Sequence, residues 1–226
     1  MDRLPIGFDT PVTVVGGGAL DETMISEARR LAPTLIAADG GADRLANLRL
    51  MPEAVIGDMD SIADPEHWRA GPARFIHLAE QDSTDFEKCL YATEAPLYLA
   101  AGFTGGRVDH SLAAMHVLLK YPDKRVVMIG AEEVMALVPA EMPLRVTLNP
   151  GSKVSIHPLR EVRATRSRGL AWPIDDLVFA PGDRSGTSNE ASEPVVEMAF
   201  EGLGALVIFE RAALASLAGA LSESGR

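Results

Sequence analysis

The sequence predicts two regions of different fold class: an α/β N-terminal domain with a parallel sheet (residues 1–131), followed by an all-β sandwich C-terminal domain (residues 132–226). Three observations lead to this prediction. As far as residue 131, short apolar runs alternate with helical patterns, which is typical of a parallel sheet covered on both faces. After residue 131, strand-like runs follow one another with glycine, proline and asparagine between them. A chain of 226 residues is also long enough for two small domains.

In the N-terminal region, short apolar runs predict the strands and longer periodic segments predict the helices. The expected strands are Val12–Val15, Leu35–Ala38, Ala54–Ile56, Arg74–Leu78, Leu97–Ala101 and Val126–Ile129. The expected helices are Asp21–Leu31, Ala42–Leu48, Thr84–Ala92 and Val108–Lys120. Ser83 or Thr84 can cap the third helix, with a glutamate at capping-box spacing. Leu112, Met115 and Leu119 share one face of the fourth helix.

The C-terminal region predicts strands almost exclusively. The expected strands are Val134–Val138, Leu144–Leu148, Lys153–His157, Val162–Thr165, Asp176–Phe179, Pro194–Phe200 and Leu206–Phe209. The polar segment Gly186–Glu190 lies between two of them, and a β-turn is the simplest interpretation of it. A short helix is expected at Ala212–Ala220, and Ser222–Arg226 is expected to fray.

Composition excludes several classes of protein. The formal net charge of −11 argues against non-specific nucleic-acid binding, which requires a basic surface. An acidic protein that handles polyanions is expected to do so through bound cations. The single Cys89 cannot form an internal disulfide, and the chain shows neither a membrane-length apolar run nor a secretory signal. We therefore expect a soluble cytoplasmic protein.

Acidic residues follow the predicted strands of the first region: Asp39, Asp58, Asp60, Asp82 and Asp85. The carboxyl ends of parallel strands face one crevice, where ligands bind. Carboxylates that are close together repel one another, so such a cluster indicates a cation, and ligation by oxygen alone favours Mg²⁺. The alternative is that these aspartates serve as turn formers and helix caps.

Two glycine-rich segments are candidates for binding phosphate. Gly16–Gly18 follows a strand and precedes a helix, but it lacks the third glycine of the dinucleotide fingerprint, so a plain turn is equally compatible. Gly105 and Gly106 precede Arg107, which could bind phosphate in a bidentate manner or could be a solvated helix-end residue. His110 could transfer protons or form a structural hydrogen bond. Trp172 is compatible with either the core or a ligand platform.

The ordered set of motifs resembles the thiamine pyrophosphokinases. It comprises Ala38-Asp39-Gly40-Gly41-Ala42, Gly57-Asp58-Met59-Asp60-Ser61, Gln81-Asp82-Ser83-Thr84-Asp85-Phe86-Glu87-Lys88, Gly105-Gly106-Arg107-Val108-Asp109-His110 and Thr187-Ser188-Asn189-Glu190. The resemblance implies an ATP-binding α/β domain at residues 1–131 and a thiamine-binding sandwich at residues 132–226. It also implies a homodimer with active sites between its subunits. The implied reaction transfers pyrophosphate from ATP to the thiamine hydroxyl, which gives thiamine diphosphate and AMP.

The resemblance also implies roles for individual residues. Asp58, Asp60 and Asp85 match the catalytic acids that hold Mg²⁺ and handle phosphate. The nucleotide site would include Asp39, Gln81, Thr84, Arg107 and Asp109. The thiamine site would include Trp172, Ser188 and Asn189.

Two other functions remain open on the residues alone. One is a phosphatase of the haloacid-dehalogenase type, since Asp58-Met59-Asp60 follows a strand and Asp58 could be phosphorylated. That interpretation leaves the β region and the other motifs without a role. The second is a non-catalytic nucleotide-binding module built on Gly16–Gly18.

Overall fold

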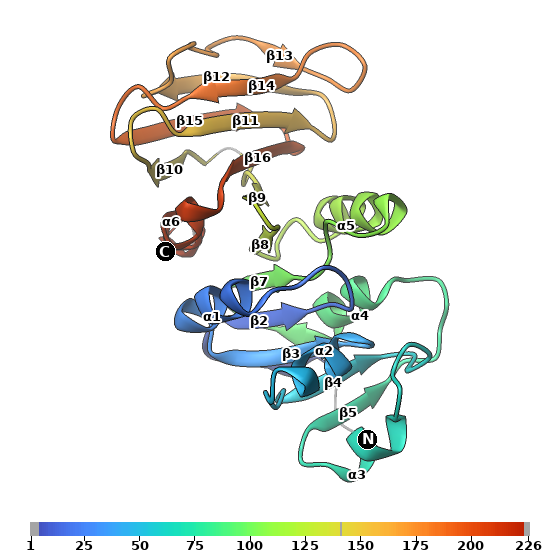
Figure 1. Ribbon diagram of the computed structural model, residues 1–226. Helices are drawn as coiled ribbons and strands as arrows, with labels where there is room; N and C mark the ends of the chain where they lie inside the picture. Colours follow the sequence, from blue (N-terminus) through green and yellow to red (C-terminus); the bar gives the residue numbers. More distant parts are fainter. Residues whose placement is uncertain (1–4, 141, 224–226) are drawn as a thin grey trace. The chain divides into compact units, whose positions relative to one another are not determined.

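The computed structural model describes residues 5–140 and 142–223, which form two compact units (Figure 1). The N-terminal unit comprises the residues up to 117 together with 128–131. The C-terminal unit comprises residues 118–127 together with those from 132 onward. The α/β and all-β classes predicted for the two regions are confirmed.

The N-terminal unit is built on a parallel sheet in the order β7-β2-β3-β4-β5. Its strands are β2 (Val12–Val15), β3 (Thr34–Ala38), β4 (Ala54–Gly57), β5 (Arg74–His77) and β7 (Tyr98–Ala101), and β8 (Val126–Ile129) comes next to β7. All residues of β2, β4 and β7 are buried, as expected of strands covered on both faces. The order places β3, β4 and β5 side by side.

Helices connect these strands: α1 (Glu22–Leu31), α2 (Gly41–Asn47), α3 (Pro65–Ala70), α4 (Asp85–Ala92) and α5 (Val108–Lys120). The Thr84 side chain caps α4 by accepting a hydrogen bond from the Glu87 N–H at 3.3 Å. The sequence did not predict α3, nor the two-residue strands β1 (Ile6–Gly7) and β6 (Thr93–Glu94), which pair in parallel. Six- and two-residue elements are too short to show a hydrophobic period.

The buried face of α5 differs from the one that the leucine spacing suggests. Ala114, Val117 and Leu118 are buried, whereas Leu112 is 65% exposed. The apolar residues of this helix occupy more than one face, so spacing alone does not identify the buried side.

The C-terminal unit consists of antiparallel strands in two groups, β14-β11-β16-β9 and β10-β15-β12-β13. The bounds are β9 (Glu133–Leu137), β10 (Leu144–Thr147), β11 (Lys153–Pro158), β12 (Val162–Arg168), β13 (Val178–Phe179), β14 (Gly186–Glu190), β15 (Val195–Glu201) and β16 (Ala205–Glu210). A 3₁₀ turn (Arg211–Ala213) and α6 (Leu214–Glu223) follow. Burial alternates along β10, β11 and β15, as in a sheet with one face on a core. A Cβ on Gly186 would lie 3.1 Å from the Phe179 ring, so β14 and β13 of the two groups face each other.

Several elements differ from the sequence prediction, including the following three. Gly186–Glu190 is a strand rather than a turn, because β11 pairs with it and provides its hydrogen-bond partners. The polar sequence of this segment does not predict that pairing. The strand expected from Asp176 begins at Val178, since Asp176 has a positive φ of 63°. The terminal helix begins at Leu214 after the 3₁₀ turn.

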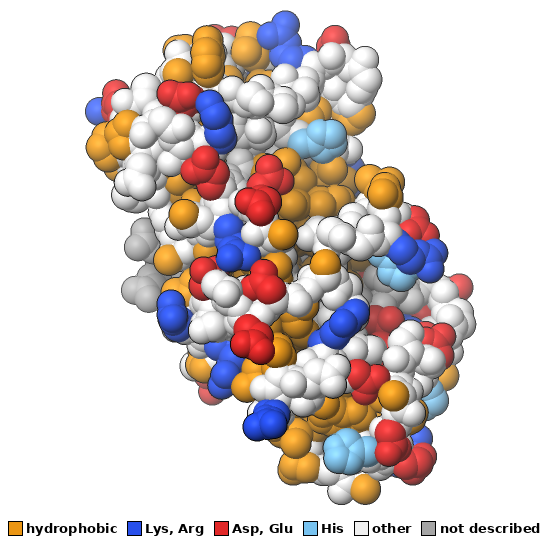
Figure 2. Space-filling view, viewed as in Figure 1, with side chains coloured by type: hydrophobic (Ala, Val, Ile, Leu, Met, Phe, Trp, Pro, Cys, Tyr) orange, Lys and Arg blue, Asp and Glu red, His pale blue; other side chains and the backbone are white. Residues whose placement is uncertain are grey.

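Acidic and basic side chains are interspersed over the face of the molecule shown in Figure 2. Among the residues that the structure describes, none of the helices combines the length and the hydropathy that a membrane span requires.

Candidate active site

The loops that follow β3, β4 and β5 meet at one cavity of about 830 Å³ within the N-terminal unit. Carboxyl ends of neighbouring parallel strands lie at the same edge of a sheet, so these loops converge. The predicted residues that line the cavity are Asp39, Asp58, Asp60, Gln81, Thr84, Asp85 and Arg107. Asp82, the remaining acid of the predicted group, is exposed and lies outside this lining.

Asp39 is the most deeply buried of the acids, at 1% exposed. Its Oδ2 accepts a hydrogen bond from the Ser61 N–H at 3.1 Å, whereas its buried Oδ1 has no hydrogen-bond partner among the described residues. Burial, together with the charge of Asp85, raises the pKa of Asp39 to about 6. Gly57 makes room for this side chain, since a Cβ there would lie 2.8 Å from the Asp39 Cβ. A buried carboxylate oxygen without a donor is ready to accept a cation.

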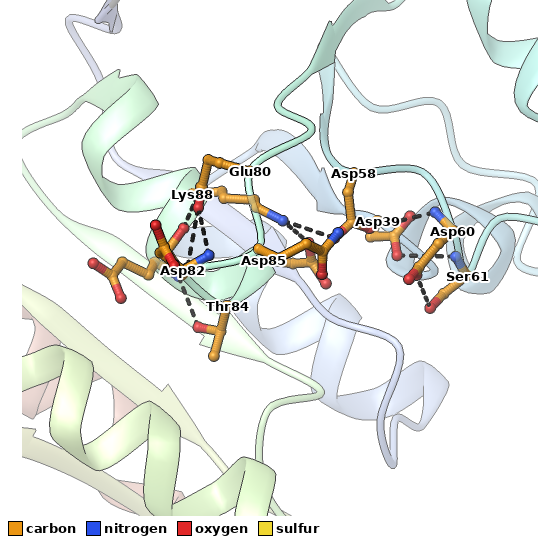
Figure 3. Close-up of polar contacts among 12 residues, drawn as sticks. Asp39, Asp58, Asp60, Ser61, Glu80, Asp82, Thr84, Asp85 and Lys88 are labelled. Atoms are coloured by element: carbon orange, nitrogen blue, oxygen red, sulfur yellow. Dashed lines mark hydrogen bonds and ion pairs between the residues drawn. The ribbon is translucent and has the colours of Figure 1, made fainter.

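Asp58 and Asp60 lie on a tight loop immediately after β4 (Figure 3). The Asp60 N–H donates to Asp58 Oδ1 at 3.4 Å, and the Ser61 hydroxyl donates to Asp60 Oδ1 at 2.9 Å. Between these two acids Met59 adopts a φ of 68°, the left-handed region that a non-glycine residue rarely occupies. One carboxylate oxygen from each of Asp39, Asp58 and Asp60 lies within 4.8 Å of the other two. Oxygen ligands so arranged suit a hard divalent cation.

Lys88 of α4 supplies a buried positive charge to this cluster, which the sequence analysis did not single out. Its Nζ lies 2.8 Å from Asp58 Oδ2 and 3.4 Å from Asp85 Oδ1 (Figure 3), and the side chain is 1% exposed. Burial tends to raise the pKa of Asp58, but the hydrogen bonds from Lys88 and the Asp60 N–H hold it below its usual value. Burial raises the pKa of Asp85, with Lys88 opposing the shift. The spacing of Asp85 and Lys88, three residues apart on one helix, is the signal that could have indicated the pair.

A hydrogen-bonded loop presents Gln81 to the same cluster. Gln81 Nε2 donates to Asp58 Oδ2 at 3.0 Å. Glu80 holds the loop in shape by accepting from the N–H groups of Asp82 and Ser83 at 3.0 and 3.1 Å, and from the Tyr91 hydroxyl at 2.8 Å. Asp58 Oδ2 thus receives two donors, one from Gln81 and one from Lys88.

Glycines form the opposite wall of the cavity. A Cβ on Gly16 or Gly18 would lie 2.7 or 2.5 Å from the Gly102 carbonyl oxygen, so two backbone segments approach each other at a distance that only glycine permits. Arg44 Nε donates to the Gly17 carbonyl oxygen at 3.1 Å and fixes the loop to α2. These glycines line the cavity, and none of them has a side chain to separate its backbone from a ligand there.

Arg107 lines the cavity, but in this structure its guanidinium group is occupied by a nearby carboxylate. Its Nε and Nη2 lie 3.1 and 2.6 Å from the two carboxylate oxygens of Asp109, and both side chains are largely exposed. The hydrogen bond from Arg107 lowers the pKa of Asp109 to about 2. His110 also lines the cavity, and its backbone N–H donates to Asp109 Oδ1 at 3.0 Å. Asp109 therefore contacts Arg107 rather than lining the cavity itself.

The predicted residues of the C-terminal unit line a second cavity, of about 340 Å³. Trp172 is 60% exposed, which excludes a core role within this chain. The buried Asn189 holds the backbone of Trp172 at both ends: its Nδ2 donates to the Trp172 carbonyl at 2.7 Å and its Oδ1 accepts from the Trp172 N–H at 3.2 Å. Ser188 has a φ of 64°, and its N–H donates to the Ser155 hydroxyl at 3.0 Å.

Comparison with known proteins identifies the family. The model of the family described as "Thiamin pyrophosphokinase, catalytic domain" matches residues 26–129. The chain is 28% identical over 195 residues to thiamine pyrophosphokinase 2 of Arabidopsis thaliana, covering 71% of this chain and 72% of that protein. It is 36% identical to the thiamine pyrophosphokinase of Bacillus subtilis over 91 residues, covering 38% of this chain and 42% of that protein. The chain belongs to the thiamine pyrophosphokinase family.

Solved structures of thiamine pyrophosphokinases share the fold. The crystal structure of the protein from Geobacillus thermodenitrificans aligns with a TM-score of 0.73 at 24% identity, covering 88% of this chain and 96% of that one. The yeast thiamin pyrophosphokinase structure aligns with a TM-score of 0.73 at 15% identity, covering 92% of each chain. The α/β and antiparallel β regions described above therefore match the architecture of thiamine pyrophosphokinases.

Family membership decides between the functions that the residues alone left open. The match spans the loops that carry Asp39, Asp58, Asp85 and Arg107. It therefore spans these three acids and Arg107 together, whereas a phosphatase would use only the Asp58 loop and a nucleotide-binding module only the Gly16–Gly18 loop. The structure adds Lys88 and Arg44 to the residues that line this cavity, and Glu80 holds the loop that carries Gln81.

Proposed function

We propose that the acidic cavity of the N-terminal unit binds ATP with Mg²⁺, and that the chain transfers the terminal pyrophosphate of ATP to the thiamine hydroxyl. The thiamine diphosphokinase activity follows from the family. One observation supports this location above the others: the buried, donor-free Oδ1 of Asp39 belongs to an acid whose carboxylate lies within 4.8 Å of Asp58 and Asp60. Buried carboxylates that lack partners are costly, and a cation offsets that cost.

The residues present fit a magnesium ion, and we assign Asp39, Asp58 and Asp60 to hold it. The sequence placed Asp85 in this set. In the structure Asp85 lines the same cavity while its Oδ1 faces Lys88, which makes it a fourth acid beside the proposed ligands. When bound, Mg²⁺ neutralises charge on the phosphate oxygens and leaves the β-phosphorus open to attack.

The protein's own groups position ATP in this proposal. Gly16–Gly18 offers backbone to the phosphates, and Arg107 exchanges its contact with Asp109 for a phosphate oxygen. Attack by the thiamine hydroxyl oxygen forms a bond to the β-phosphorus, and the bond from that phosphorus to the α-phosphate oxygen breaks, which releases AMP. A cavity carboxylate accepts the hydroxyl proton. We propose Asp85, because its raised pKa suits it to hold a proton.

The cavity of the C-terminal unit is the proposed thiamine site. Thiamine is a cation with two rings, and the exposed face of Trp172 can stack on it. The oxygen and the nitrogen of the Asn189 side-chain amide both bond to the Trp172 backbone. We therefore propose that Asn189 holds Trp172 in place and that Ser188 encloses the substrate. We also propose a homodimer with active sites between subunits. The exposed Val108 and Leu112 of α5, at 73% and 65%, support an apolar contact with a second copy.

Product analysis tests the proposed reaction directly. The chain is incubated with thiamine, ATP and Mg²⁺, and the products are separated by chromatography. Thiamine diphosphate and AMP in equal amounts are expected, whereas thiamine monophosphate and ADP would contradict pyrophosphoryl transfer. Asp82→Asn is a matched control for substitutions in the cavity, because Asp82 belongs to the same loop region but is exposed outside the cavity lining.

A further inference from the structure

Lys88 is a buried ammonium group within a cavity that is proposed to take a second cation. Its side chain is 1% exposed, and its Nζ contacts Asp58 Oδ2 at 2.8 Å and Asp85 Oδ1 at 3.4 Å. A buried charge is costly unless it is paired, and both of its partners belong to the acidic cluster. Lys88 therefore contributes a fixed positive charge at the place where the divalent cation is expected.

The position of Lys88 makes it a competitor for the charge of the cluster. Asp58 is shared, since it contacts Lys88 and is also one of the three acids that could hold a metal. Its Oδ2 already receives hydrogen bonds from Lys88 and from Gln81. Two like charges a few ångströms apart in a partly buried site repel strongly, because the surroundings screen them less than bulk water does.

We propose that Lys88 is a resident counter-ion that keeps the affinity of the acidic cluster for a free divalent cation low, so that the metal enters together with the phosphates of the nucleotide. This inference rests on the proposed function, in which the cluster holds Mg²⁺. In the absence of nucleotide, Lys88 neutralises part of the charge of Asp58 and Asp85. The nucleotide brings negative charge of its own, which offsets Lys88 and allows a second cation to bind.

The experiment measures binding of Mn²⁺ alone, by electron paramagnetic resonance of the free ion at fixed ionic strength. Lys88→Met removes the charge and keeps a side chain of similar length. Lys88→Gln also removes the charge but keeps a hydrogen-bond donor for the two aspartates. Lys88→Arg keeps the charge. The Met and Gln variants are expected to bind Mn²⁺ at least tenfold more tightly than the wild type, a difference of about 1.4 kcal/mol, and the Arg variant within about threefold of it.

A matched control separates local charge from the net charge of the protein. Lys153 forms an exposed ion pair with Glu190 at 3.0 Å in the C-terminal unit. Lys153→Met makes the same chemical change, so its Mn²⁺ affinity is expected to equal that of the wild type. Tighter binding in this control as well would overturn the role assigned to Lys88.

The second measurement adds the α,β-methylene analogue of ATP, in which the bond that the reaction cleaves is blocked. The analogue is expected to tighten Mn²⁺ binding to the wild type at least tenfold, and to tighten binding to Lys88→Met and Lys88→Gln by a smaller factor. If Lys88 had a purely structural role, the analogue would tighten Mn²⁺ binding by the same factor in the variants as in the wild type. Lys88→Gln makes the same comparison with a hydrogen-bond donor retained at this buried position, so the test does not depend on the folding of Lys88→Met.

Two results would overturn the inference, and only the second of them would also contradict the proposed function. Unchanged or weaker Mn²⁺ binding in folded Lys88→Met and Lys88→Gln proteins would show that Lys88 orients Asp58 rather than competing with the metal, while leaving the proposed function intact. Absence of Mn²⁺ binding to every protein, even with the ATP analogue present, would contradict the metal site itself and with it the proposed function. Circular dichroism establishes that each variant is folded.

Discussion

The cavity proposed for ATP and the cavity proposed for thiamine are lined by different kinds of side chain. The N-terminal cavity gathers buried charges, with Asp39 at 1% exposed and Lys88 equally buried. The C-terminal cavity presents an exposed aromatic side chain, Trp172, whose backbone is held by the buried amide of Asn189. A site for charged phosphates and metal needs charges that are fixed and partly shielded from water, because shielding strengthens their interaction. A site for an organic cation needs an aromatic face that the ligand can reach.

This contrast predicts that substitutions in the N-terminal cavity change the chemical step, whereas those in the C-terminal cavity change thiamine affinity. The first kind of substitution removes charge from a site where charges interact strongly. The second removes contact area at an exposed surface. The expected effects therefore differ in size as well as in kind.

Asp60→Asn is expected to have the largest effect. It keeps the size of an exposed side chain, so the fold is retained, and it removes one carboxylate of the proposed metal set. We expect kcat to fall at least about 10²-fold, corresponding to about 3 kcal/mol or more of lost transition-state stabilisation. Steady-state kinetics at limiting Mg²⁺ measure this, with Asp82→Asn as the control that keeps its activity. Nearly full activity of Asp60→Asn would show that the acidic cluster has been misinterpreted.

Asp39→Asn is expected to separate stability from function. The pKa of Asp39 is about 6 in the folded chain against 3.8 for the free side chain, so the folded state binds more protons between these values. Stability of the metal-free protein therefore falls as the pH rises from about 4 to about 6, because the folded carboxylate becomes charged at a cost. Asparagine cannot ionise, and it tolerates the positive φ of 44° at this position.

We expect Asp39→Asn to be more stable than the wild type by about 1–3 kcal/mol at pH 7.5 without metal, with the difference shrinking towards pH 4. Urea unfolding at both pH values measures the effect, and kinetics are expected to show loss of turnover. A variant that is less stable than the wild type at pH 7.5 would contradict the unfavourable environment assigned to this carboxylate.

Trp172→Ala tests the C-terminal cavity and has a built-in comparison. The chain has two tryptophans, and Trp68 of α3 is 3% exposed whereas Trp172 is 60% exposed. We expect Trp172→Ala to raise the thiamine KM by a factor corresponding to about 1–2 kcal/mol, with little change in Tm and in ATP affinity. Trp68→Ala, by contrast, is expected to cost about 3–5 kcal/mol of stability and leave the thiamine KM of the folded protein unchanged. The reverse pattern would remove Trp172 from the thiamine site.

The sequence was sufficient for the parts of the N-terminal cavity that depend on topology. Alternating strands and helices predict a parallel sheet, and a parallel sheet brings the loops after its strands to one edge. Asp39, Asp58, Asp60 and Asp85 therefore meet in the cavity although 46 residues separate the first from the last. Local capping rules likewise offered Ser83 or Thr84 as the cap of this helix, and in the structure Thr84 caps α4.

The remaining features depend on contacts that no local pattern encodes. Lys88 looks like an ordinary helix residue until the fold places Asp58 beside it, 30 residues away in sequence. Asn189 resembles a turn residue until β14 pairs with β11 and brings it to the Trp172 backbone. In both cases the role of the residue depends on which distant group becomes its hydrogen-bond partner. Tertiary packing determines that partner, and local propensity does not.

The smallest expected effect concerns Arg107, which the structure pairs with Asp109. Exposed ion pairs contribute roughly 0.2–1 kcal/mol, so the competition between Asp109 and a phosphate for this guanidinium is weak. Asp109→Asn removes the competing charge, and we expect ATP to bind about two- to threefold more tightly at low salt, with the gain fading as salt rises. Asp176→Asn is the matched control, because Asp176 forms a similar exposed pair with Arg163 at 3.0 Å in the C-terminal unit. Calorimetric titration with the α,β-methylene analogue of ATP measures both variants; weaker binding to Asp109→Asn would show that the Asp109 carboxylate serves the nucleotide site, as the sequence motif implies.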